Sequence, residues 1–338
     1  IRLDDQAIAS ITVNDGGTFH GKTKQYGTSK SIVTVNEGGE WNQGAVLYDE
    51  SETQVTLGGY LAQAIRMSHE SRASIDILST GYWADNAAVN LSRDINPDDD
   101  RAADFTASVS GIWNGKLNAS GSSRSSVTVN EGGVWTSPGD NIMIVMAVMP
   151  GAFYGWDEPV IQTAESYFSL TRAAGIMSLT GGSAVSVTDN GEWYGRASLE
   201  GGSSADITIG STGVWSYLDP ESLNQGGFAD AIFLTSLSLA SFGSLSDASG
   251  NLILDVSDGS AVTVENNHKM YGAAGAVGTD SSITMTVGKG AEWSYMDPLS
   301  VPDTAVTPAW SQASSKVILG AGLGATVDLT DNGTIRGI

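Results

Sequence analysis

A short phrase that returns along the chain constrains the fold more than any other feature of the sequence. Its clearest copy, SVTVNEGGVW, ends at Trp135, and close copies end at Trp41 (SIVTVNEGGEW) and Phe19 (SITVNDGGTF). Looser copies end at Trp83, Trp113, Trp193, Trp215, Trp293 and Ile335. A repeat of fixed period indicates an architecture of stacked, similar units, because one such unit cannot bury its own apolar face.

The spacing between the final residues of these copies gives the size of one unit. Trp41 follows Phe19 by 22 residues, and Trp135 follows Trp113 by 22. The spacings from Trp41 to Trp83 and from Trp293 to Ile335 are both 42, or two steps of 21, and a degenerate copy ends at Met270. This period is too short for a propeller blade of about 40 to 50 residues.

Each copy predicts a β-strand that ends in a tight turn. Val127, Thr128 and Val129 alternate apolar and polar side chains, which is the period of a strand. The Asn-Glu-Gly-Gly that follows is turn chemistry, because Asn and Gly tolerate a left-handed backbone. We therefore predict an all-β fold, a right-handed parallel β-helix with about 21–22 residues per coil. With room left for insertions, 338 residues at this period give roughly ten to thirteen coils, and at about 4.8 Å per coil the rod would be about 50 to 60 Å long.

The recurring aromatic residues are interpreted as a structural column at one corner of the coil. By parity along the strand, Trp135 faces the same way as Val129. The alternative is a row of exposed aromatic residues that binds sugar. The predicted column contains Phe19, Trp41, Trp83, Trp113, Trp135, Trp193, Trp215 and Trp293.

The period predicts that residues 1–338 form a single solenoid, a fragment of a longer chain. Insertions interrupt it near 136–172, 216–255 and 294–313; the alternative for the first two is extra coils with eroded sequence. The last two begin alike, with WSYLDP after Gly-Val and WSYMDP after Ala-Glu. The apolar run Ile142–Met149 is far shorter than the roughly 20 residues of a membrane-spanning helix, so we predict a buried strand there.

The strongly negative net charge of the chain excludes some classes of binding partner. The formal net charge is −22, with 38 acidic and 16 basic residues, so we predict no nucleic-acid partner and no direct membrane insertion by this chain. The chain has no cysteine, which suits an exported bacterial protein and equally a cytosolic one.

The sequence offers few candidate sites, and we predict neither an enzyme nor a required cofactor. No Gly-x-Ser-x-Gly elbow occurs, and the three histidines have no metal-binding spacing. The paired aspartates, Gly-His-Gly and Arg-x-Lys of pectin-degrading β-helix enzymes are missing. One acidic loop resembles the opening of a calcium loop, although a solvated loop is the default interpretation. Its candidate ligands are Asp94, Asn96, Asp98 and Asp100, with Asp104 nearby.

With its strand, Gly-Gly turn and recurring Trp, the phrase resembles the coils of bacterial autotransporter passenger domains. The resemblance covers residues 10 to 335. It implies export through a C-terminal outer-membrane barrel that would lie beyond this chain. It also implies display on the surface of a Gram-negative bacterium. Many passengers of this Ser/Thr/Gly-rich, acidic kind are adhesins that bind host molecules or copies of themselves.

The resemblance and the repeat leave two main functions open. The first is an adhesin that binds a host extracellular protein or glycan, or another copy of itself, and so promotes adhesion, aggregation or biofilm. For this function the best local candidates for ligand binding are Tyr154, Trp156 and Asp157, which insertion loops would carry. The second is a structural stalk that presents another domain. A polysaccharide-degrading enzyme or a phage tailspike is a weaker alternative.

Overall fold

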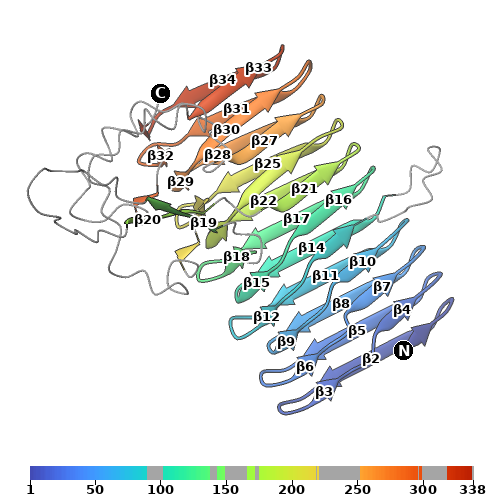
Figure 1. Ribbon diagram of the computed structural model, residues 1–338. Helices are drawn as coiled ribbons and strands as arrows, with labels where there is room; N and C mark the ends of the chain where they lie inside the picture. The colour runs from blue at the N-terminus through green and yellow to red at the C-terminus, as the bar shows by residue number, and fades with distance from the viewer. Residues whose placement is uncertain are drawn as a thin grey trace, which may run out of the picture.

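The computed structural model describes residues 1–89, 102–137, 143–148, 166–171, 175–217, 219–220, 252–295, 297–298 and 318–336. Within these residues the chain winds through eleven coils, which stack into a rod (Figure 1). Each coil contributes one strand to each of three parallel eleven-stranded sheets, here called sheets A, B and C in chain order. The all-β parallel β-helix predicted from the repeat is therefore confirmed.

The three sheets differ in strand length. Sheet A contains β1 (Arg2–Leu3), β4 (Thr23–Gln25), β7 (Ala45–Leu47), β10 (Ile65–Met67), β13 (Ala87–Val89), β16 (Leu117–Ser120), β21 (Gly175–Thr180), β24 (Arg196–Leu199), β27 (Leu252–Ser257), β30 (Ala273–Val277) and β33 (Leu319–Gly322). Sheet B contains the six-residue strands β2 (Ile8–Val13), β5 (Lys30–Val35), β8 (Glu52–Leu57), β11 (Arg72–Ile77), β14 (Asp104–Val109), β17 (Arg124–Val129), β22 (Ala184–Asp189), β25 (Ser204–Ile209), β28 (Ala261–Asn266), β31 (Ser282–Val287) and β34 (Thr326–Asp331). Sheet C contains β3 (Thr18–Phe19), β6 (Glu40–Trp41), β9 (Tyr60–Leu61), β12 (Tyr82–Trp83), β15 (Ile112–Asn114), β18 (Val134–Thr136), β23 (Glu192–Tyr194), β26 (Val214–Ser216), β29 (Lys269–Tyr271), β32 (Glu292–Ser294) and β35 (Thr334–Arg336).

The alternation in sheet B decides which side chains fill the rod. Val127 and Val129 of β17 point inward and are 1% and 0% exposed, whereas Thr128 between them points outward and is partly exposed. Strands without an intervening insertion pair residues 20 to 22 apart, as in Ser31↔Thr53 and Ala184↔Ser204. The repeat period is thus the length of one coil, and equivalent residues form columns along the rod.

The turn from sheet B to sheet C has two lengths. In the long turn, six positions separate the last inward residue of sheet B from the next inward residue of sheet C, as from Val129 to Trp135. In the short turn the separation is four, as from Val109 to Trp113. From the second coil to the eleventh, long and short turns alternate, so the structural repeat is two coils.

Glycine is required in the long turn for two different reasons. Gly132 has φ +78°, a conformation that side chains other than Gly rarely adopt. At Gly133 a Cβ would clash with the Val109 carbonyl oxygen of the previous coil, so the coils approach too closely for a side chain.

The inward residues of sheet C form the aromatic column. The register joins Phe19, Trp41, Leu61, Trp83, Trp113, Trp135, Trp193, Trp215, Met270, Trp293 and Ile335. All seven tryptophans in it are 0% exposed, and rings from Trp83 to Trp215 stack with centroids 4.2 to 5.3 Å apart. This geometry agrees with a structural column, and burial leaves no face of these seven tryptophans for a sugar.

Indole hydrogen bonds tie the column to the corner that follows it. The Trp135 Nε1–H donates to the Gly115 carbonyl oxygen at 3.0 Å, and Trp215 Nε1–H donates to Gly195 at 2.9 Å. Trp41, Trp83, Trp113 and Trp293 make the equivalent bond to the previous coil. The Trp193 Nε1–H has no hydrogen-bond partner among the described residues.

The insertions do not add coils to the rod. Trp135 pairs directly with Trp193, and Trp215 pairs directly with Met270, so no sheet C strand lies between the members of either pair. The alternative of eroded coils at 136–172 and 216–255 is therefore wrong, and residues 252–255 belong to β27. The expected copy at Met270 is confirmed. Trp293 pairs directly with Ile335, so that spacing of 42 is one coil with an insertion and not two units.

The apolar run near residue 145 is a strand, as predicted. β19 (Met143–Val148) pairs antiparallel with β20 (Ser166–Thr171) in a separate two-stranded sheet. The prediction that this strand is buried stays a prediction, because its side chains are not among the described parts of the structure.

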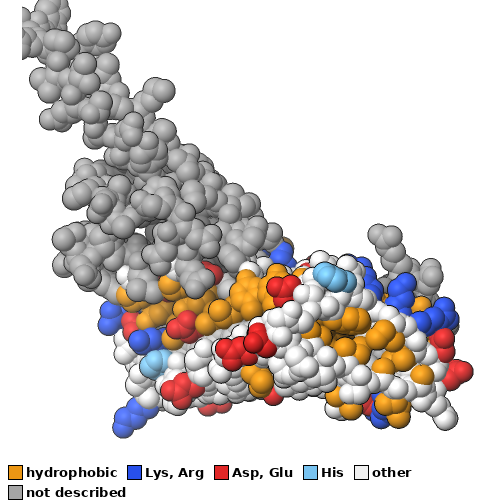
Figure 2. All heavy atoms as spheres, turned by 90° about the horizontal axis from the view of Figure 1, so that it is seen from below, with side chains coloured by type: hydrophobic (Ala, Val, Ile, Leu, Met, Phe, Trp, Pro, Cys, Tyr) orange, Lys and Arg blue, Asp and Glu red, His pale blue; other side chains and the backbone are white. Residues whose placement is uncertain are grey.

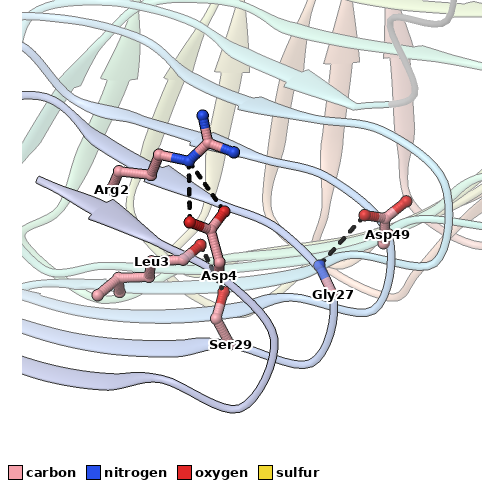
Figure 3. A network of polar contacts seen from close by, with 6 residues as sticks. All are labelled: Arg2, Leu3, Asp4, Gly27, Ser29 and Asp49. Atoms are coloured by element: carbon pink, nitrogen blue, oxygen red, sulfur yellow. Dashed lines mark hydrogen bonds and ion pairs between the residues drawn. The ribbon is translucent and has the colours of Figure 1, made fainter.

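Short polar contacts hold the turn from sheet A to sheet B. The Gly27 amide donates to Asp49 Oδ2 at 3.1 Å, and Ser29 Oγ donates to the Leu3 carbonyl oxygen at 3.5 Å (Figure 3). Ser29 begins a column of buried serines that directly precede sheet B: Ser29, Ser51, Ser71, Ser123, Ser183, Ser203, Ser260 and Ser281. At Gly27 and Ser29, hydrogen bonds thus join consecutive coils at this corner.

Figure 2 shows the molecule from below the view of Figure 1, which is the side of the N-terminal coil. Hydrophobic side chains gather there in a band over part of the described surface. Ile8 is 75% exposed, and Ile11 and Phe19 of the same coil are partly buried.

Candidate functional site

The candidate site is the corner between sheets C and A, here called the exit corner. Three insertions leave the rod there: insertion 1 (138–174), insertion 2 (218–251) and insertion 3 (296–317). They follow β18, β26 and β32, which belong to the sixth, eighth and tenth coils. All three coils have the long turn, so the insertions share one corner at a regular two-coil spacing.

The outward column beside this corner changes character along the rod. Each column residue directly follows an inward residue of the aromatic column, so it points to the outer face of sheet C. In the first two coils this position holds His20, which is exposed, and Asn42, which is partly exposed. In coils six to ten it holds Thr136, Tyr194, Ser216, Tyr271 and Ser294, which are all at most 7% exposed. The outer face of sheet C is therefore covered where the insertions leave.

Two buried aspartates provide part of that cover. Thr136 Oγ1 donates to Asp219 Oδ2 at 2.6 Å, across 83 residues of sequence. Ser216 Oγ donates to Asp297 Oδ2 at 2.5 Å, across 81 residues. In each case an aspartate near the start of one insertion binds the hydroxyl that precedes the insertion two coils earlier. We call these two contacts the clasps.

A buried tyrosine lies in the coil between the two ends of each clasp. Burial raises the pKa of Tyr194 far above its usual value, and the nearby carboxylates of Glu192, Asp219 and Asp297 raise it further. Burial likewise raises the pKa of Tyr271, with Glu292 and Asp297 adding to the effect. Both phenols therefore stay neutral under physiological conditions. Among the described residues, the exit corner therefore contains buried, uncharged tyrosines that lie near carboxylate groups.

An exposed aromatic pair lies on the outer face of sheet C in the N-terminal half. Tyr60 is 38% exposed and stacks on Tyr82 with ring centroids 5.7 Å apart. Asn114 Nδ2 donates to the Tyr82 hydroxyl at 2.7 Å. The sequence reasoning missed this pair; its signal was a tyrosine directly before the inward position in two consecutive coils.

A buried carboxyl in the core was also missed. Asp189 is 0% exposed and takes the inward position that Val129 and Ile209 occupy in the neighbouring coils. Its Oδ1 accepts a hydrogen bond from the Gly191 amide at 3.1 Å, while Oδ2 has no partner among the described residues. Burial raises the pKa of this carboxyl to about 8, mainly by desolvation.

The binding and metal candidates predicted from the sequence fall outside the described residues. This holds for the ligand-binding candidates Tyr154, Trp156 and Asp157, and for the calcium candidates Asp94, Asn96, Asp98 and Asp100. Asp104, which is described, lies 3.7 Å from Arg72 in an exposed ion pair. Within the described ranges no three His, Asp or Glu side chains converge as a metal site would require.

The three histidines lie apart from the exit corner's clasps. His20 Nδ1 is 3.3 Å from Asn42 Nδ2, and His69 Nδ1 is 3.2 Å from the Ser68 hydroxyl. Partial burial lowers the pKa of His268, and the charge of Lys269 adds to this shift. These surroundings suit ordinary surface or turn residues.

Across the part of the chain that the structure describes, no helix has the length and apolar character needed to cross a membrane. No protein-family model matches this chain, and no curated protein matches it significantly.

Proposed function

We propose that this chain is the rod of a cell-surface adhesin and that its recognition surface lies at the exit corner. The observation that carries the proposal is the common exit of three insertions from one corner, at alternate coils, with buried clasps between their bases. A rod that merely separated two domains would have no need of insertions built onto one corner. Loops positioned by a rigid scaffold are a common way to form a binding surface.

The resemblance to autotransporter passengers supplies the setting of this proposal. A passenger would be exported through an outer-membrane barrel and displayed on a Gram-negative cell. Many copies on one cell would turn weak individual contacts into firm adhesion.

The net charge indicates which kind of partner the proposed adhesin would bind. With a net charge of −22, the chain attracts basic patches on a host extracellular protein and repels nucleic acid. Another copy of the chain would carry the same charge, so self-association would require screening by salt or by divalent cations. Sedimentation at low and high salt, with and without calcium, separates self-association from binding to a host protein or glycan.

The experiment compares a triple variant and a double variant of the full chain displayed on cells. Y154A/W156A/D157A changes the insertion residues singled out by the sequence, and the control Y60A/Y82A removes exposed aromatic rings from the open half of sheet C. Binding to immobilised matrix proteins and glycans should fall at least tenfold in the first variant and remain in the second. Loss of binding only in the control would place recognition on the N-terminal half and contradict the proposal.

A structural stalk is the second candidate, favoured by the column of mostly aromatic inward residues that continues through all eleven described coils. Retention of adhesion by both variants, with adhesion depending on a domain outside this chain, would favour the stalk.

A further inference from the structure

The clasps join parts of the chain that are remote in sequence but successive along the exit corner. Asp219 lies in insertion 2 and binds Thr136 at the base of insertion 1; Asp297 lies in insertion 3 and binds Ser216 at the base of insertion 2. Asp219 and Asp297 are 7% and 2% exposed. A hydrogen bond to a buried carboxylate is stronger than one between neutral groups and costly to break on one side only.

The second clasp has an additional bond. The Asp297 amide donates to the Tyr217 hydroxyl at 3.3 Å, so both the side chain and the backbone of Asp297 contact the base of insertion 2. The Tyr217 amide in turn donates to the Tyr271 carbonyl oxygen at 3.3 Å. The base of insertion 2 is therefore held from the coil above it and from insertion 3.

The hydroxyl of each clasp occurs at the coils that carry an insertion. Thr136 and Ser216 occupy this outward position in coils six and eight, whereas Ala62 and Ala84 occupy it in coils three and four. An aspartate at the corresponding point of insertion 1 would face Ala84, which has no hydroxyl to donate. The series of clasps consequently begins at Thr136, the base of the first insertion at this corner.

We infer that Asp219 and Asp297 are positioning residues that join the bases of successive insertions at the exit corner into one unit. Each clasp fixes where an insertion begins relative to the insertion before it. The proposed partner would then bind a surface whose parts are set two coils apart. The role of this unit in recognition rests on the proposed function; the coupling between insertion bases does not.

Hydrogen exchange of the full chain, followed by mass spectrometry, tests the coupling without any ligand. D219A and T136V each remove one side of the first clasp, T136S retains its hydroxyl, and D206A is the control on the exposed face of the same coil as insertion 2. Exchange at the Tyr217 amide should be at least tenfold faster in D219A and in T136V, and unchanged in T136S and D206A. The double variant T136V/D219A should be no faster than the faster single variant, because both remove the same bond.

For the second clasp, D297A and S216A should each accelerate exchange at the amides of residue 297 and Tyr217. Unchanged exchange in these variants, or a double variant whose acceleration is the product of the two single effects, would overturn the inference. The same variants, displayed on cells, are also tested for binding to immobilised matrix proteins and glycans. This second measurement distinguishes the clasps from the proposed function. Faster exchange with undiminished binding would support the coupling of the insertion bases and refute recognition at the exit corner. Lost binding with unchanged exchange would refute the coupling.

Discussion

Replacement of Asp189 by Asn should stabilise the rod at neutral pH and remove part of its pH dependence. The carboxyl lies in a core column between Val129 and Ile209, with one oxygen hydrogen-bonded and the other without a partner among the described residues. Its pKa is raised from 3.8 to about 8. Near pH 7 the folded state therefore keeps the proton, while the unfolded chain loses it.

The sign and size of the effect follow from this difference. Because the folded pKa is raised, the contribution of Asp189 to stability is full below about pH 4 and is lost as pH rises toward 8. The slope over this window is about 1.4 kcal/mol per pH unit, and by pH 7 the accumulated loss is roughly 4 kcal/mol.

The structure shows how an amide fits at this position. Asn266 occupies the same inward position two coils later; its Oδ1 accepts from the His268 amide, and its Nδ2 donates to the Glu292 carbonyl oxygen. For an amide side chain at position 189, Val214 takes the place of Glu292, directly before the next tryptophan. The substitution thus removes an ionisable group from the core, and by analogy with Asn266 we expect the new amide to donate to the Val214 carbonyl oxygen.

The assay is urea unfolding of wild type, D189N and D331N at pH 5 and pH 8, followed by tryptophan fluorescence. Asp331 makes the same contact to the amide two residues ahead but is exposed, so D331N is the matched control. We expect the gain in unfolding free energy from D189N to be larger at pH 8 than at pH 5 by about 4 kcal/mol. A D189N variant that is less stable at pH 8, or as pH-dependent as wild type, would refute this reasoning.

Two further predictions concern the column and the turn. W135F should destabilise the chain by about 1 kcal/mol more than W193F, because only Trp135 loses an indole hydrogen bond, to Gly115. Equal unfolding midpoints for the two variants would contradict the role of that bond. G133A should cost more than G132A, by about 1 kcal/mol or more, since a Cβ at 133 meets the Val109 carbonyl oxygen and one at 132 meets only solvent. Thermal melts decide this comparison, and a larger loss in G132A would show that strain at positive φ outweighs the clash.

The repeat made the architecture predictable because the same physical problem recurs in every coil. Valines on one side of a strand must be buried by the next coil, and a tryptophan at a constant position must stack on its equivalent. Copies without an aromatic residue were harder to place. Leu61 fills the column between Trp41 and Trp83, and its copy, VTLGGYL, keeps the Val-Thr strand and Gly-Gly but lacks the Asn-Glu and ends in Leu.

The clasps show where prediction from sequence ended. The echo between WSYLDP and WSYMDP was visible, but nothing in either motif indicates that its aspartate binds a hydroxyl more than 80 residues away. Asp189 is a similar case. Its turn motif, Asp-Asn-Gly, is the same as that of Asp331, and only the coils stacked on both sides bury one of the two carboxyls.

By itself, the sequence determined the period, the strand and turn of each coil, and the residues that face inward, because these depend on contacts between neighbours in the chain or between equivalent positions of a regular stack. Tertiary structure alone decided which insertions leave the same corner, which hydroxyls and carboxylates meet there, and which acidic group loses its water. Those outcomes depend on segments brought together across one or two coils, and burial and hydrogen bonding at such a meeting point are properties of the assembled rod.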